Sequence, residues 1–219
     1  MIAFTDPAAT RLAAAIARDD DRLLRQLLAA GADLDATGTD GIGLLGWAVV
    51  RLRRRPFSTL LDAGADIGYA DNHGDSVMHY AAIAPDHWYL DVLLNRQHIE
   101  PDLGNSRTGR TPLMDAILHQ RHAQIELLLA AGADPNNRDH GGELPLHLAA
   151  EIDDYPSILA LLRAGANPDL RNHQGATFQR YLAMTPSSLF TTQARDAREE
   201  LVTWLDDHNI TVDKGLSER

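Results

Sequence analysis

The sequence contains no cysteine among its 219 residues, and aromatic residues make up only 5% of it. The absence of cysteine excludes disulfides, a thiol nucleophile and zinc sites built on thiolates. No apolar run approaches the roughly 18 residues that a membrane-spanning helix needs. What is present is an apolar fraction of 44%, much of it alanine and leucine. Such a core favours closely packed helices over a thick sandwich.

Charge narrows the classes of partner. Acidic residues outnumber basic ones by 31 to 20, so the formal net charge is −11 at pH 7. Nucleic-acid phosphates repel such a chain, whereas a basic protein would attract it. The opening stretch MIAFTDPAATRLAAAIARDDDR lacks the basic front and long apolar run of a secretory signal. We therefore expect a cytoplasmic protein that binds neither nucleic acid nor membrane.

Two sets of glycines recur along the chain. Gly-Ala-Asp or Gly-Ala-Asn begins at Gly31, Gly64, Gly132 and Gly165. A second set comprises Gly41, Gly74, Gly109, Gly142 and Gly175, which follow one another at a period of about 33 residues with one two-residue insertion. The member expected between Gly64 and Gly132 is degenerate, because Gln97 stands where the glycine should be.

A longer motif surrounds the second set of glycines. It reads DHGGELPLHLAA at 139–150, DNHGDSVMHYAA at 71–82, SRTGRTPLMDAI at 106–117, GTDGIGLLGWAV at 38–49 and NHQGATFQRYLA at 172–183. This pattern, followed by a second helix that ends in Leu-Leu-x-x-Gly-Ala-Asp, resembles that of ankyrin repeats. The copies at 38 and 172 match less well than the others.

The resemblance implies a mainly α fold, an ankyrin-repeat α-solenoid of stacked helix-turn-helix units with short β-hairpin-like turns and a cap at each end. We expect a single domain over 1–219: a cap at 5–37, repeats at 38–70, 71–105, 106–138 and 139–171, and a C-terminal cap at 172–219. Helices are predicted near 7–18 and 20–30 in the first cap. A further helix is predicted at 194–207, with Leu201, Trp204 and Leu205 facing inward.

Most of the conspicuous residues have structural interpretations. The glycines supply turn backbone that other residues adopt at a cost. Thr111 and Ser76 are placed to cap the helix that follows, and Pro112 suits its first turn. The resemblance implies that His79 and His147 hydrogen-bond to backbone between adjacent turns.

Three clusters suggest chemistry, and each also has a structural interpretation. The arginines at 51, 53, 54 and 55 could bind an acidic groove or phosphate, or could lie at a solvated helix end that favours cations. His119 and His122 could bind a metal, but no third ligand follows at suitable spacing. Asp153 and Asp154 could be paired acids, but a loop before a helix fits the proline at 156 better. We predict no metal, no cofactor and no catalytic residue.

The resemblance places a partner-binding surface on the hairpin tips and on the exposed face of the first helix in each pair. The corresponding tip residues are Thr39, Asp40, Ile42, Asn72, His73, Asp75, Arg107, Arg110, His140 and Glu143. The helix-face residues are Trp47, Arg51, Tyr80, Ile83, Asp115, His119, Leu148, Glu151 and Tyr181. Exposed aromatic residues ringed by polar groups are typical interface anchors, yet Trp47 and Tyr80 could equally fill gaps between helices.

Three functions follow as hypotheses. The first is a non-enzymatic, monomeric module that binds a protein partner, which is basic if charge guides it, and acts as an inhibitor such as a bacterial toxin-neutralising immunity protein. The arginine bias, with Lys214 the only lysine, is a hint of a GC-rich bacterial source. The second is a secreted effector or general scaffold. The third is an enzyme that uses the irregular stretch 177–207.

Overall fold

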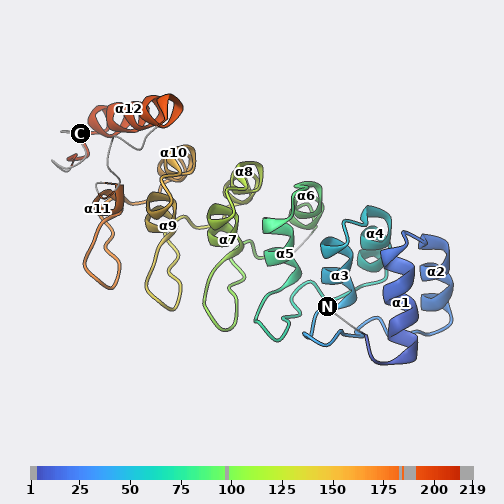
Figure 1. The fold of residues 1–219 in the computed structure, drawn as a ribbon. Coiled ribbons are helices and arrows are strands. Elements are labelled where there is room, and N and C mark those ends of the chain that lie inside the picture. The colour runs from blue at the N-terminus through green and yellow to red at the C-terminus, as the bar shows by residue number, and fades with distance from the viewer. Residues whose placement is uncertain (1–3, 97–98, 183, 185–190, 213–219) are drawn as a thin grey trace. The chain divides into compact units, whose positions relative to one another are not determined.

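The computed structural model describes residues 4–96, 99–182, 184 and 191–212, and within these ranges the ordered elements are helices without any strand (Figure 1). The chain divides into two compact units, Met1–Thr108 and Gly109–Arg219. The first unit holds α1 (Pro7–Ala17), α2 (Asp21–Ala29), α3 (Leu44–Val50), α4 (Arg54–Asp62), α5 (Val77–Ile83) and α6 (Trp88–Leu94). The second holds α7 (Pro112–Leu118), α8 (His122–Ala130), α9 (Pro145–Glu151), α10 (Tyr155–Arg163), α11 (Phe178–Leu182) and α12 (Thr192–Asp207). In the described part of the chain, no helix has the length and apolar character needed to cross a membrane.

Capping residues explain where several helices begin. The Asp6 side chain accepts a hydrogen bond from the backbone of Ala9 at 2.8 Å, and Pro7 opens α1. Thr111 caps α7 through Met114 in the same way, as the sequence predicts. These side chains satisfy backbone N–H groups that the helix itself leaves without partners.

In the first unit, the first helices of neighbouring pairs pack against one another, and the second helices do the same. The first helices α1, α3 and α5 contact one another in succession, and α2 contacts α4. The rings of Phe57 on α4 and Tyr89 on α6 meet edge to face at 5.1 Å, and both side chains are fully buried. Because each pair covers the apolar face of the pair beside it, stability is a sum over neighbours.

The second unit repeats this arrangement. Helix α9 lies between α7 and α11, and α10 lies between α8 and α12 (Figure 1). Leu201 and Leu205 of α12 are fully buried, which confirms the predicted inward face of a terminal helix. Trp204 differs from that prediction: it is half-buried and stacks on His208, with ring centroids 3.8 Å apart.

The glycines of both sets adopt the left-handed backbone that the turn interpretation requires, with φ between 72° and 94° at all nine positions. At Gly109 a close approach adds a second constraint. A Cβ placed there would lie 2.8 Å from the backbone nitrogen of His140 in the next hairpin. The period of about 33 residues is therefore the spacing at which successive hairpins touch.

Each predicted repeat range contains one helix pair: α3 and α4 in 38–70, α5 and α6 in 71–105, α7 and α8 in 106–138, and α9 and α10 in 139–171. The single-domain assignment over 1–219 stays a prediction. Gln97, the degenerate turn position, lies outside the described residues, as do most of the connection before α12 and the last seven residues.

Candidate functional site

Four of the hairpins are held from within by one side chain at the start of the turn. The Asp71 carboxylate accepts hydrogen bonds from the backbone N–H groups of His73 at 2.8 Å and Asp75 at 3.0 Å. Asn105, Asp139 and Asn172 accept from their own turns in the same manner. This Asx arrangement fixes the turn backbone without help from a partner.

Asn105 corrects the sequence alignment. The motif placed Ser106 in register with Asp71, but Ser106 is exposed, whereas Asn105 is buried and binds the backbones of Arg107 and Thr108 at 2.8 and 2.9 Å. Asn105 stands four residues before Gly109, whereas Asp71 stands three before Gly74, so this turn contains one of the two inserted residues. Counting back from the turn glycine by the usual spacing selects Ser106 instead of Asn105.

Adjacent hairpins in the first unit are also joined to each other. The backbone N–H of Asn72 donates to the carbonyl of Asp40 at 3.1 Å, and that of Ser106 donates to Gly74 at 3.2 Å. The Arg107 guanidinium donates to the carbonyl of Asn72 at 2.9 Å. The tips are therefore tied into one framework within this unit.

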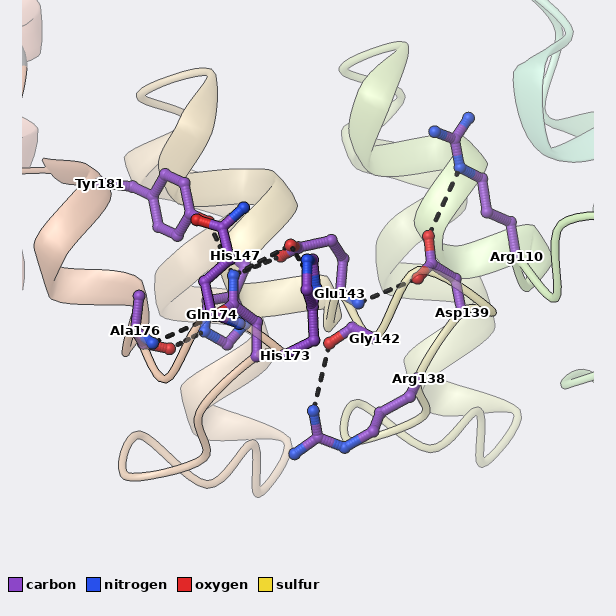
Figure 2. Close-up of polar contacts among 11 residues, drawn as sticks. Arg110, Arg138, Asp139, Gly142, Glu143, His147, His173, Gln174, Ala176 and Tyr181 are labelled. Carbon is purple, nitrogen blue, oxygen red and sulfur yellow. Dashed lines mark hydrogen bonds and ion pairs between the residues drawn. The ribbon is translucent and has the colours of Figure 1, made fainter.

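In the second unit, Asn172 brings together Glu143 and Tyr181, two predicted binding residues that Figure 2 labels. Its amide donates to the Glu143 carboxylate at 2.9 Å and to the Tyr181 hydroxyl at 2.7 Å. His173 lies 3.7 Å from the same carboxylate. The sequence pattern did not single out Asn172 as the residue that connects them.

His147 makes the hydrogen bond to the next turn that the resemblance implies, and the His79 bond to Ser76 lies within its own repeat. His147 is 2% exposed, and its Nε2–H donates to the carbonyl of Ala176 in the next turn at 2.8 Å (Figure 2). His79 is also 2% exposed, and its Nδ1 accepts a hydrogen bond from the backbone N–H of Ser76 at 3.1 Å.

Burial makes His147 a contributor to acid sensitivity. Burial lowers the pKa of His147 below its usual value, although the hydrogen bond to Ala176 and the charge of Glu143 oppose the shift. Below about pH 6.5, the imidazole of His147 therefore binds a proton more readily in the unfolded chain than in the folded chain. The free energy of unfolding should fall as the pH drops from 7 to 5. Denaturant unfolding at several pH values should show a smaller fall for His147→Gln, and equal slopes in both proteins would contradict the assignment.

Exposure divides the proposed partner-binding residues into three groups. The side chains that lie at the surface are Thr39, Asp40, Arg51, Asn72, His73, Arg107, His119, His140 and Glu151. Those that are half-buried are Trp47, Asp75, Tyr80, Ile83, Arg110, Asp115, Glu143 and Tyr181. Their binding role stays a prediction.

Two of the proposed residues are not at the surface. Ile42 is 1% exposed and Leu148 is 4% exposed, so their placement on the binding face is wrong. Ile42 follows the turn glycine, where the chain re-enters the core, and its side chain would contact a Cβ at Gly46. Leu148 lies in α9, which is covered by α7 and α11. An apolar residue at a variable position is buried when both neighbouring helices cover it.

Trp47 and Tyr80 have contacts within the fold. The indole N–H of Trp47 donates to the carbonyl of Ala13 at 3.2 Å, and the Arg51 guanidinium lies 5.5 Å from its ring centroid. The Tyr80 hydroxyl donates to the Asp71 carboxylate at 2.5 Å. Both residues therefore fill and brace gaps between elements, and their half-exposed edges remain available to a partner.

The arginine run spans two helix ends. Arg51 follows the last residue of α3, where a cation favours the helix dipole, but Arg54 and Arg55 lie in the first turn of α4, where it does not. The expected helix-end interpretation is thus right for Arg51 alone. Arg54 is compensated by Asp86 at 2.7 Å and by the ring of Trp88, whose centroid is 5.0 Å away.

The histidine pair and the aspartate pair, each a candidate site in the sequence, meet in one contact between His122 and Asp154. His122 donates through Nε2 to the carboxylate of Asp154 at 2.9 Å, while Nδ1 of His119 lies 2.9 Å from its own helix at Asp115. Asp154 caps α10, and Asp153 occupies the turn with φ of 53°. The loop interpretation of the two aspartates is confirmed.

Comparison with known proteins agrees with this geometry. A family model described as ankyrin repeats, three copies, matches residues 89–172. Residues 89–172 therefore resemble ankyrin repeats, and the fold is that of an ankyrin solenoid. The fold agrees with the crystal structures of the Bcl-3 ankyrin repeat domain, with a TM-score of 0.73, 23% identity and coverage of 86% of this chain and 81% of that one. It also agrees with EF0377, an ankyrin repeat protein, with a TM-score of 0.74, 21% identity and coverage of 89% and 97%.

Relatives in sequence include the protein PhlB of Serratia liquefaciens, 41% identical over 141 residues, which are 64% of this chain and 61% of PhlB. The nuclear factor NF-kappa-B p105 subunit of Gallus gallus is 34% identical over 112 residues, half of this chain and 11% of that protein. The chain thus spans less than two thirds of PhlB and about a tenth of p105. Ankyrin repeats such as those at 89–172 indicate a protein–protein interaction module.

Proposed function

We propose that this ankyrin array holds a basic partner protein against its hairpin tips and first-helix face, and that it acts as an inhibitor or toxin-neutralising immunity protein. The observation that carries the proposal is the internal bracing of the hairpins. Four of the turns are fixed by Asx side chains, and the hairpin of Asp40 is bonded through its backbone to that of Asn72, while tip side chains such as Asp40, Asn72 and His140 lie exposed. A surface that is ordered before binding loses less entropy when the partner arrives.

Charge supports the choice of a basic partner. The net charge of −11 steers a cationic protein toward the array and raises its association rate. Inhibition would then follow from occlusion, because a standard interface of roughly 1,600 Å² is large enough to cover a catalytic cleft. The bacterial source of the relative PhlB supports a bacterial setting. We propose that the protein is cytoplasmic and acts as a monomer.

The test begins with capture of the partner from source cells by the tagged chain, followed by reconstitution from purified components. Asp40→Arg should weaken the reconstituted complex about tenfold, mainly through a slower association rate that depends on salt. Glu126→Arg is a matched control, since it makes the same charge change on an exposed position of α8, a second helix. Equal losses in both variants would contradict a tip-centred interface. A partner that keeps its activity in the complex would contradict inhibition.

A further inference from the structure

The first repeat lacks side chains at two positions that the other repeats fill. Gly43 precedes α3, where Ser76 precedes α5, and Gly46 lies within α3, where His79 stands in α5. No side chain caps α3, whereas Ser76 and His79 form a capping box at the start of α5. The two glycines therefore remove local stabilisation, and at Gly46 the missing side chain lets Ile42 and Tyr80 approach, since a Cβ there would lie 3.1 and 3.3 Å from them.

Both glycines line a hollow of about 20 Å³ within the first unit. Ring carbons of Tyr69 and Tyr80 wall it: a Cβ on Gly43 would lie 3.5 Å from Tyr69, and one on Gly46 would lie 3.3 Å from Tyr80. Tyr69 is 41% exposed, unusually high for a large apolar side chain here. A hollow needs about 10–15 Å³ to hold one water molecule, so this one accepts a single small polar group.

The lining of the hollow carries negative charge. Asp66, Asp71 and Asp75 contribute to it, and no Lys, Arg or His does so among the described residues. Asp71 is only 8% exposed, which strengthens its field. Burial raises the pKa of Tyr80 well above its usual value, and the hydrogen bond to Asp71 and the charges of Asp71 and Asp75 raise it further. The hollow therefore disfavours an anion and favours a cation.

We propose that this lysine hollow, formed by Gly43, Gly46, Tyr69, Tyr80 and the three aspartates, receives the ammonium group of a lysine side chain on the partner. The inference rests on the proposed function and names the chemistry of one contact. An ammonium group is a compact point charge close to a water molecule in size, whereas a guanidinium group is a broader plane. The exposed ring of Tyr69 offers an apolar surface along which the lysine methylenes can lie.

The test is an NMR titration of the full chain with two capped tripeptides, acetyl-Gly-Lys-Gly-amide and acetyl-Gly-Arg-Gly-amide. The lysine peptide should give saturable shifts at the amides of Gly43 and Gly46, with an affinity at least fivefold higher than that of the arginine peptide. Equal affinities, or shifts scattered over acidic positions outside the lysine hollow, would overturn the proposal. General attraction to a chain of net charge −11 would produce that second pattern.

Gly43→Ser supplies the decisive variant. Gly43 has φ of −74° and ψ of 164°, which serine adopts freely, and its new Cβ would make an ordinary contact with Tyr69. The variant should fold at least as well as the original and should bind the lysine peptide at least fivefold more weakly. Gly141→Ser, an exposed position in the other unit, is the control and should bind unchanged. Retained binding in Gly43→Ser would overturn the proposal.

The titration needs no natural partner, so the two proposals fail separately. If the lysine peptide binds as described but no partner responds to Asp40→Arg, the proposed function fails and the lysine hollow stands. If the partner responds to Asp40→Arg but the peptide shows no preference for lysine, the hollow is overturned and the binding surface stands.

Discussion

Replacing Gly109 with alanine is expected to lower the free energy of unfolding by about 2–4 kcal/mol. Two causes add at this position. The backbone has φ of 72°, which a residue with a Cβ adopts at a cost, and the new Cβ would lie 2.8 Å from the backbone nitrogen of His140. Backbone cannot rotate away as a flexible side chain can, so the hairpin that begins near Asp139 must shift.

Gly132 separates the two causes. It has φ of 89°, but a Cβ there would meet nothing within 4 Å. Gly132→Ala should therefore cost only the backbone term, about 1 kcal/mol, and Gly132→Val should cost more because a β-branched residue resists this conformation. Denaturant unfolding followed by circular dichroism would measure all three variants. A loss for Gly109→Ala no greater than that for Gly132→Ala would show that contact between hairpins contributes nothing.

Much of the fold was predictable because it depends on local rules that the sequence repeats. The helices predicted near 7–18 and 20–30 appear as α1 and α2 at Pro7–Ala17 and Asp21–Ala29. The turn glycines adopt positive φ because few other residues do so readily. The cap at Thr111 and the proline after it follow from the backbone groups that every helix start exposes.

The candidate site was less predictable because it depends on contacts between residues about thirty positions apart. The register of the motif placed Ile42 at a tip, but the exposure of its side chain is decided by the helix that packs over it. The register of the motif also did not predict that Asn172 would hydrogen-bond to both Glu143 and Tyr181. The lysine hollow was missed for a similar reason: the loss of Thr and His from the motif at 38–49 was visible, but Tyr80 on the other side of the hollow comes from the next repeat.

Asp154 shows how such a contact combines two roles that the sequence suggested separately. The carboxylate is 4% exposed, caps α10 at Ser157 and accepts the Nε2–H of His122 from the preceding repeat at 2.9 Å. It also accepts the hydroxyl of Ser157 at 2.6 Å. One side chain thus satisfies three donors, two of which are buried with it.

Asp154→Ala should lower the free energy of unfolding by about 2–4 kcal/mol, because the loss of a cap costs about 0.5–2 kcal/mol and each buried donor left without a partner costs about 1–3 kcal/mol. Asp153→Asn is the matched control, since it removes the same charge from the adjacent residue, and asparagine tolerates the φ of 53° found there. We expect the control to stay within about 0.5 kcal/mol of the original protein. Similar losses in both variants would mean that the charge of the loop matters rather than the cap. Since α10 lies between α8 and α12, the loss at Asp154 should also expose amides of both neighbours to hydrogen exchange, as expected where each pair is stabilised by the next.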